Sequence, residues 1–156
     1  MEERVYVDES GINRFVQREK ARALRGVKIE DTKRGRKFKR INIIGGLAGG
    51  EYMAMEYYDH TTTSEFFESW FADSLLPAVP KGHTVIMDNA SFHRKAPLRE
   101  LAAEAGVRLL FLPAYSPDFN PIEHSWANLK RWLVDNMADF DDLVSAIKHY
   151  FYLWTP

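Results

Sequence analysis

The sequence predicts an α/β fold built on a mixed five-stranded sheet, a three-stranded antiparallel meander plus parallel strands, with helices on both faces. Two observations predict it. Three strand-like segments come first, and beyond residue 60 helical and strand patterns alternate. Helical crossovers force the later strands to run parallel. At 156 residues, 46% of them hydrophobic, the chain fits a single domain, residues 1–156, with its own core.

The first three elements are predicted as strands. Residues 4–8, RVYVD, alternate and are rich in valine, which predicts a strand that ends near Asp8, with SGIN turning the chain. Residues 38–48 and 51–59 are predicted as two further strands. Gly49 and Gly50 between them are a hairpin signal.

The later elements alternate between helix and strand. A capping box from Thr62 to Glu65 predicts the start of the first helix, and Gly106 predicts the end of the second. Two short apolar segments are typical of strands that are covered on both faces. The predicted helices are 61–79, 96–106, 121–133 and one from about residue 141; the predicted strands are 83–88 and 107–113.

Composition excludes several classes of protein. The sequence contains no cysteine, which excludes disulfides and thiolate metal sites. Its first ten residues are charged where a signal peptide is apolar, and its apolar stretches are too short to span a bilayer. We therefore expect a soluble, cytoplasmic protein whose metal sites use oxygen or imidazole.

A basic segment lies near the N-terminus, although the formal net charge of the chain is only −1. Residues 14–40 contain twelve of the 21 lysines and arginines against three acids. Such a segment is usually a solvated surface or arm, but it also suits a polyanion partner. The candidate contact residues are Arg34, Arg36, Lys37, Lys39 and Arg40.

Two aspartates follow predicted strands. Asp8 ends the first strand and Asp88 ends the fourth. In open α/β sheets ligands bind at the carboxyl ends of the parallel strands. If the first and fourth strands are neighbours, both carboxylates meet at one edge of the sheet, where a divalent cation could bind.

Glu123 has two readings. On helix logic alone, Asn120 is the N-cap, Pro121 the first helical residue, and Glu123 the third, where it reaches back to the cap. On the other reading, the proline-rich approach PAYSPDF fixes the first turn rigidly, as a metal ligand requires. With Asp8 and Asp88, Glu123 would complete an all-oxygen site for Mg²⁺ or Mn²⁺. Two such ions support in-line phosphoryl transfer.

Three blocks of the sequence carry a family resemblance: VYVDES, VIMDNASFH and YSPDFNPIEHSW. Together they resemble the signature blocks of DDE transposases of the mariner superfamily, in particular its bacterial insertion-sequence branch. Thirty-four residues separate Asp88 from Glu123, the spacing found in that branch. The basic stretch before residue 41 is also similar to the family, so the resemblance covers nearly the whole chain.

The resemblance implies a ribonuclease H-like fold, with Asp8, Asp88 and Glu123 as catalytic metal ligands for Mg²⁺ or Mn²⁺. It implies cleavage and strand transfer of double-stranded DNA at transposon ends by a homodimer. Family members carry helix-turn-helix modules ahead of the catalytic domain. Only three residues precede Arg4 here, so we expect a catalytic domain without those modules.

Two alternatives stay open: a nuclease of the same fold, such as a ribonuclease H or a resolvase, and a non-catalytic DNA-binding remnant. Asn89 and His93 follow Asp88 closely enough to contact DNA phosphate, but a turn residue and a surface histidine explain them equally well. Glu9 should face away from Asp8 by strand alternation, either in a structural role or in support of a metal ligand. Trp126 and Trp132 are expected in the core.

Overall fold

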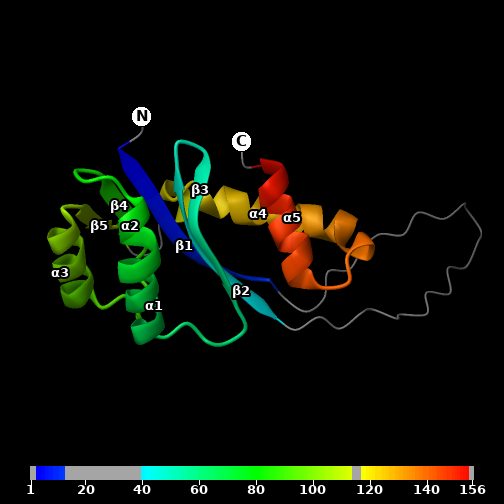
Figure 1. Ribbon diagram of the computed structural model, residues 1–156, viewed down its shortest axis with the longest axis horizontal. Coiled ribbons are helices and arrows are strands. Elements are labelled where there is room, and N and C mark those ends of the chain that lie inside the picture. The colour runs from blue at the N-terminus through cyan, green and yellow to red at the C-terminus, as the bar shows by residue number, and fades with distance from the viewer. Residues whose placement is uncertain (1–2, 13–39, 114–116, 155–156) are drawn as a thin grey trace, which may run out of the picture.

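The computed structural model describes residues 3–12, 40–113 and 117–154 (Figure 1). One sheet contains five strands in the spatial order β3-β2-β1-β4-β5. The strands are β1 (Arg4–Ile12), β2 (Ile41–Ala48), β3 (Glu51–Tyr58), β4 (Thr84–Met87) and β5 (Arg108–Phe111). β1, β2 and β3 pair antiparallel, whereas β4 lies parallel to both β1 and β5. The predicted mixed sheet is confirmed.

Helices cover both faces of the sheet, as predicted. In Figure 1, α1, α2 and α3 lie on one side of β1, and α4 and α5 on the other. The longer helices are α1 (Ser64–Trp70), the π-helical segment η1 (Phe71–Leu75), α3 (Lys95–Ala105), α4 (Ile122–Asn136) and α5 (Leu143–Trp154). Within the described residues there are also three short turns of helix: α2 (Leu76–Ala78), η2 (Pro117–Phe119) and η3 (Met137–Asp139).

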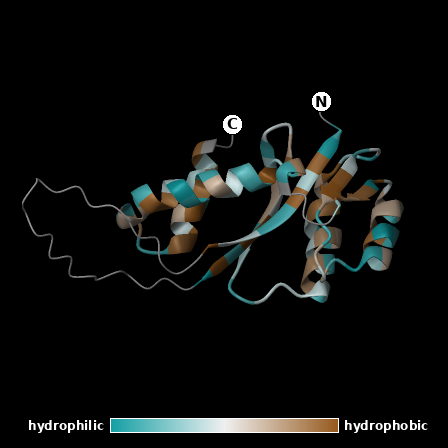
Figure 2. Cartoon of the chain, turned by 180° about the vertical axis from the view of Figure 1, so that it is seen from behind, coloured by the Kyte–Doolittle hydropathy of each residue, from teal (hydrophilic) through white to brown (hydrophobic). Residues whose placement is uncertain are grey.

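Two hydrophobic clusters hold these layers together. On one face Val5 and Val7 of β1 pack with Phe67 and other residues of α1, η1 and α3. On the other face Ile12 packs with residues of α4 and α5, among them the fully buried Trp126. Figure 2 shows hydrophobic and hydrophilic segments alternating along α3 and α4, as expected of helices with one buried side. β1 is therefore buried from both sides at the centre of the fold.

The first strand is longer than predicted. We expected it to end near Asp8 and SGIN to turn the chain, but β1 continues through this segment to Ile12. Residues 9–12 keep pairing with β2, from Glu9 opposite Ile44 to Ile12 opposite Ile41. The parallel pairing with β4, in contrast, ends at Tyr6 opposite Ile86. Asp8 thus follows the end of the parallel ladder but not the end of its strand.

The start of the first helix also differs. Its N-cap is Thr63, whose hydroxyl accepts a hydrogen bond from the backbone N–H of Phe66 at 3.2 Å, so the capping box from Thr62 to Glu65 is wrong. The hydroxyl of Thr62 instead hydrogen-bonds that of Tyr58 at 2.7 Å. Further along, the helix widens into η1 just before Pro77, which has no N–H for a regular helical bond.

β5 is not the fully buried strand that its sequence predicts. It forms an edge of the sheet, and its residues alternate between exposed and partly buried. Leu109 packs into the cluster under α3, while Leu110 on the opposite side is 51% exposed. The continuous apolar run in the sequence therefore does not indicate that only one face of this strand is covered.

The turn predictions at Gly49, Gly50 and Gly106 are confirmed. Gly49 and Gly50 both have positive φ angles and join β2 to β3, with Ala48 opposite Glu51. Gly106 ends α3 in the left-handed region. In the part of the chain that the structure describes, none of the helices combines the length and the apolarity needed to cross a bilayer.

Candidate active site

Asp8 and Asp88 lie at matching positions beyond the last paired residues of the neighbouring strands β1 and β4. β1 and β4 run parallel, and their last paired residues are Tyr6 and Ile86. Asp8 and Asp88 each come two residues later, beyond the end of the ladder. The condition that the sequence left open, that the two strands be neighbours, is met.

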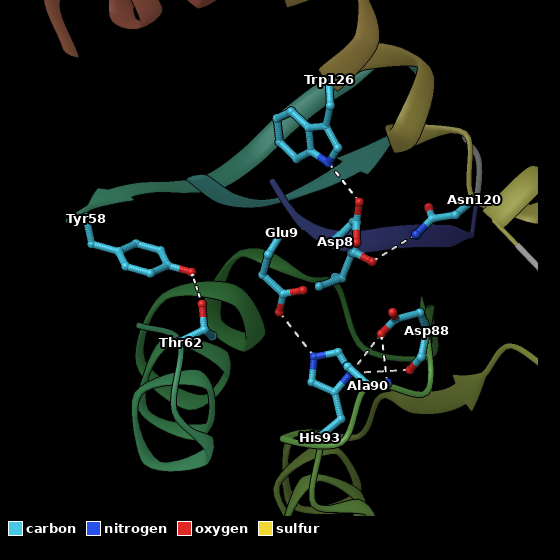
Figure 3. Close-up of polar contacts among 10 residues, drawn as sticks. Asp8, Glu9, Tyr58, Thr62, Asp88, Ala90, His93, Asn120 and Trp126 are labelled. Carbon is cyan, nitrogen blue, oxygen red and sulfur yellow. Dashed lines mark hydrogen bonds and ion pairs between the residues drawn. The ribbon is translucent and has the colours of Figure 1, made fainter. Parts of the chain in front are cut away.

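Asp8 is buried and lies against β2 and α4. It is 8% exposed, and it lies opposite Gly45 of β2. A Cβ at Gly45 would collide with the sulfur of Met55, so this glycine lets Met55 pack close to the strand. On the helix side, the indole Nε1 of Trp126 donates a hydrogen bond to Oδ2 of Asp8 at 2.9 Å (Figure 3).

Burial and neighbouring negative charge change the acidity of Asp8. Burial raises its pKa most, followed by repulsion from Glu123 and from Glu9, to about 8. The bonds from the Glu9 backbone and from Trp126 oppose this only in part. The ionised Asp8 therefore lacks a compensating positive charge, which a bound cation would supply.

The cap predicted for α4 is wrong. The helix begins at Ile122 after Pro121 and has no side-chain cap bond. The amide Nδ2 of the buried Asn120 instead donates to the backbone carbonyl of Val7 at 3.1 Å, and its Oδ1 has no hydrogen-bond partner. Asn120 thus serves the contact between α4 and β1, and the capping role that it would share with Glu123 is lost.

Two contacts attach the start of α4 to β1, one on each side of Glu123 in the sequence. Asn120 bonds Val7, and Trp126 bonds Asp8 itself. Glu123 lies between them on the first turn, with an exposed side chain whose charge acts on Asp8. The position of Glu123 relative to Asp8 is therefore set by tertiary hydrogen bonds as well as by the prolines.

Asp88 is more open than Asp8 and is held by hydrogen bonds. Its side chain is 51% exposed. Oδ1 accepts from the backbone N–H of Ala90 at 3.1 Å and lies 3.0 Å from Nδ1 of His93. The hydrogen bond from His93 lowers the pKa of Asp88, although burial partly opposes it. Asp88 is thus an ionised carboxylate that reaches solvent.

His93 is inside the protein and not on its surface, where we expected it. It is 4% exposed, and its Nε2 lies 3.1 Å from Oε1 of Glu9. Burial lowers the pKa of His93, but its hydrogen bonds and charge interactions with Asp88 and Glu9 outweigh burial and raise it to about 9. Glu9 faces away from Asp8, as strand alternation predicts, toward this histidine (Figure 3).

The remaining predicted contact residues are placed as follows. Asn89 is exposed beside Asp88, and Arg40 is exposed, with its Nε bonded to Asn42 at 3.2 Å. Arg34, Arg36, Lys37 and Lys39 lie outside the described residues. Within the described ranges, no three histidine, aspartate or glutamate side chains form a group that could hold a metal ion.

Sequence reasoning missed the polar roles of Trp126 and Asn120. Trp126 is in the core as expected, but a buried indole also needs an acceptor for its N–H, and that acceptor is Asp8. That requirement was the available signal. Asn120 gave no comparable signal, because the same residue type at the same position caps helices.

The chain is similar in sequence to parts of known proteins. The transposable element Tc1 transposase of Caenorhabditis elegans is 35% identical over 75 residues, which are 48% of this chain and 28% of that protein. The uncharacterized protein y4pE/y4sA of Sinorhizobium fredii is 33% identical over 63 residues, 39% of this chain and 44% of that protein. The chain spans less than half the length of these relatives.

Solved structures share the fold at low identity. The catalytic domain of Mos1 mariner transposase superposes with a TM-score of 0.64 at 17% identity, over 98% of this chain and 69% of that one. The catalytic core domain of BIV integrase gives 0.55 at 12% identity, over 95% and 80%. These likenesses confirm the ribonuclease H-like fold that the sequence resemblance implied.

A family model described as DDE superfamily endonuclease matches residues 3–144. Its match includes Asp8, Asp88 and Glu123 and all five strands. The chain belongs to the DDE superfamily endonuclease family.

Proposed function

We propose that this chain cleaves DNA strands and transfers them at transposon ends in a reaction that depends on a divalent cation. Asp8, Asp88 and Glu123 are the catalytic residues in this proposal. The observation that carries it is the matched placement of Asp8 and Asp88 beyond the β1–β4 ladder, in a chain of the DDE superfamily endonuclease family. Transposase relatives such as Tc1 support the strand-transfer part.

The side chains present fit a hard divalent cation. All three candidate ligands offer carboxylate oxygens, which suit Mg²⁺ or Mn²⁺. Mg²⁺ is typically bound by only one or two carboxylates together with waters and substrate phosphates, so a ready-made cluster of three is not required. The raised pKa of Asp8 reflects negative charge from Glu123 and Glu9 in a buried place, and a cation there would favour the ionised form. Paired-end complexes of Mos1 solved with Mn and with Mg agree with this choice.

Each residue would contribute in its own way. Asp8 and Asp88 would hold the cation from two neighbouring strands, and Glu123 from the first turn of α4. Bound divalent cations stabilise the attacking and the leaving oxygens of an in-line displacement at phosphorus. Trp126 and Asn120 keep α4 against β1, so that Glu123 stays near Asp8 while DNA binds and leaves.

The DNA partner is supported by charge and by the neighbours. Mos1 has been solved as a paired-end complex with a transposon end and as a strand transfer complex. In this chain the basic residues 14–40 would follow the phosphate backbone, which binds cationic side chains independently of sequence. We propose that two copies act together on DNA, as the family resemblance implies.

Calorimetric titration with Mn²⁺ tests the metal part. Wild-type protein should bind Mn²⁺, and Asp88→Asn should bind at least about tenfold more weakly, because a neutral amide replaces one of few charged ligands. Asp118→Asn is the matched control, since Asp118 is an exposed acid near the start of α4 and outside the proposed triad. Equal Mn²⁺ affinity in wild type and Asp88→Asn would contradict the proposed set of metal ligands.

Cleavage tests the reaction. A duplex carrying the terminal repeats of a related element should be cut in Mg²⁺ or Mn²⁺ and left intact in EDTA. Joining of the cut end to a second DNA marks strand transfer. Cleavage without joining would instead indicate a nuclease of the same fold.

A further inference from the structure

We propose that His93, held by Glu9, is a positioning residue that fixes the Asp88 carboxylate in its working orientation. The inference rests on the proposed function, because it assigns Asp88 the role of a metal ligand. It replaces both roles that the sequence left open for His93, which were contact with DNA and a plain surface position. A side chain that is 1% exposed has no surface to offer a phosphate.

The histidine joins the carboxylate of Glu9, in β1, to that of Asp88, directly after β4. Its Nδ1 lies 3.0 Å from Oδ1 of Asp88, and its Nε2 lies 3.1 Å from Oε1 of Glu9. Figure 3 shows the ring between these two acids, with one nitrogen directed to each. Nδ1 also lies 3.3 Å from the backbone carbonyl of Asp88. Both ring nitrogens are therefore committed to oxygen acceptors.

The contacts leave one oxygen of Asp88 available. Oδ1 receives the backbone N–H of Ala90 as well as the ring nitrogen of His93. The structure places both of these donors on Oδ1, while half of the side chain remains exposed. A carboxylate with one oxygen fixed by two donors presents the other in a defined direction, as partners behind a metal ligand commonly do.

The same contacts connect β1 to β4 where the backbone no longer does. The ladder between these strands stops at Tyr6 and Ile86. Three residues past Tyr6, the side chain of Glu9 reaches His93, which in turn contacts Asp88. Consecutive residues of β1 thus serve the site from both faces of the sheet: Asp8 directly, and Glu9 through the histidine.

A purely packing role is the competing explanation. The His93 ring lies 4.2 Å from the ring centre of Phe67 and 4.6 Å from that of Phe92. Packing alone would be served equally well by an apolar side chain. The Glu9 side chain, however, is only 13% exposed, and a buried carboxylate without its partner is strongly unfavourable. The arrangement therefore needs the polar atoms of His93 and not only its volume.

Mn²⁺ titration of the full chain separates the two explanations. His93→Leu fills the ring space without donors and should weaken Mn²⁺ binding about tenfold or more. His93→Asn keeps an N–H near the position of Nδ1 and should stay within about threefold of wild type. Glu9→Leu, which removes the acceptor at the other end, should weaken binding in the same direction. Phe92→Leu disturbs the same ring cluster without touching a carboxylate and is the matched control.

These experiments distinguish a failure of the positioning role from a failure of the proposed function. Wild-type affinity in folded His93→Leu and Glu9→Leu would overturn the positioning role while leaving the metal site standing. If wild type itself binds no Mn²⁺, the metal part of the proposed function fails, and metal-free crystal structures decide the inference. The positioning role is supported if Asp88 adopts more than one rotamer in His93→Leu or Glu9→Leu but only one in wild type and Phe92→Leu. A single rotamer in all of them contradicts it.

Discussion

The indole of Trp126 donates a hydrogen bond of 2.9 Å to the carboxylate of Asp8, across 118 residues of sequence. The donor comes from α4, the helix whose first turn carries Glu123, and the acceptor from the central strand β1. One bond therefore joins the two elements whose acids the proposed reaction needs together. The free energy that this hydrogen bond contributes depends on the ionisation of Asp8, since a charged acceptor strengthens a hydrogen bond.

Trp126→Phe removes this bond while keeping most of the buried ring. We expect the free energy of unfolding to fall by about 1–3 kcal/mol, from the lost bond to a carboxylate and the smaller ring. Urea denaturation at pH 8 measures it. Trp132→Phe on the same helix is the control, because Trp132 is half-buried and packs on Phe140 and Tyr150 instead. A loss no larger than that of the control would mean that the bond to Asp8 contributes little.

Asp8 makes the stability of the metal-free protein depend on pH. Its pKa rises from 3.8 to about 8 on folding, so the folded state holds a proton that the unfolded state releases. Stability contributed in this way is present below pH 4 and is lost as pH rises toward 8. His93, whose pKa is raised from 6.5 to about 9, acts in the same direction but only above pH 6.5. The window from pH 5 to 6.5 therefore reports mainly on Asp8.

Asp8→Asn should remove this dependence. Without metal, the variant should melt at least about 3 °C higher than wild type at pH 7, and the difference should shrink at pH 5. Added Mn²⁺ should stabilise wild type and leave the variant unchanged, because a ligand stabilises only the state that binds it. Thermal melts in EDTA and in Mn²⁺ measure both effects. A wild type that gains stability from pH 5 to 6.5 relative to Asp8→Asn would contradict the raised pKa.

The basic segment gives a prediction of its own. If Arg34, Arg36, Lys37, Lys39 and Arg40 follow a DNA backbone, replacing all five with alanine weakens binding equally for every DNA sequence. The slope of log affinity against log salt should flatten by roughly 0.9 for each lost phosphate contact. Fluorescence anisotropy with two unrelated duplexes measures this. An unchanged slope would mean that the segment is a solvated surface that does not contact DNA phosphate.

Local patterns in the sequence predicted the elements and their order, but not how far each reaches. Alternation and glycine turns suffice for the β2–β3 hairpin and for the end of α3 at Gly106. β1 runs past Asp8 because residues far along the chain, 41–44 of β2, continue to pair with it. The exposure of Leu110 likewise depends on which helix reaches the edge strand. These are tertiary facts, which a local pattern does not contain.

The acids proposed for the site came from the sequence, and the residues that support them did not. Asp8 and Asp88 were proposed from strand ends and parallel topology, and Glu123 from its proline-rich approach and from a resemblance to a family. The contact of Asn120 with Val7 was hidden, since asparagine before a proline is also a good cap. The contact of Glu9 with His93, which in turn contacts Asp88, joins residues 84 positions apart and had no local signature beyond the alternation that turns Glu9 away from Asp8.

Glu123 decides between a structural and a chemical account of the start of α4. Glutamine occupies nearly the same space, and the side chain is exposed on a helix that has no side-chain cap bond, so Glu123→Gln should fold normally. As a ligand, however, the carboxylate supplies charge that an amide does not. Asp135→Asn, an exposed acid further along α4, is the matched control.

The most direct test is nicking of a supercoiled plasmid in Mn²⁺ by wild type, Glu123→Gln and Asp135→Asn, with thermal melts of all three. We predict melting temperatures within a few degrees of one another. Nicking by Glu123→Gln should be reduced at least about 100-fold, while Asp135→Asn cuts like wild type and EDTA stops the reaction. Glu123→Gln protein that nicks as fast as wild type would contradict the Asp-Asp-Glu account and leave Glu123 a residue of the fold alone.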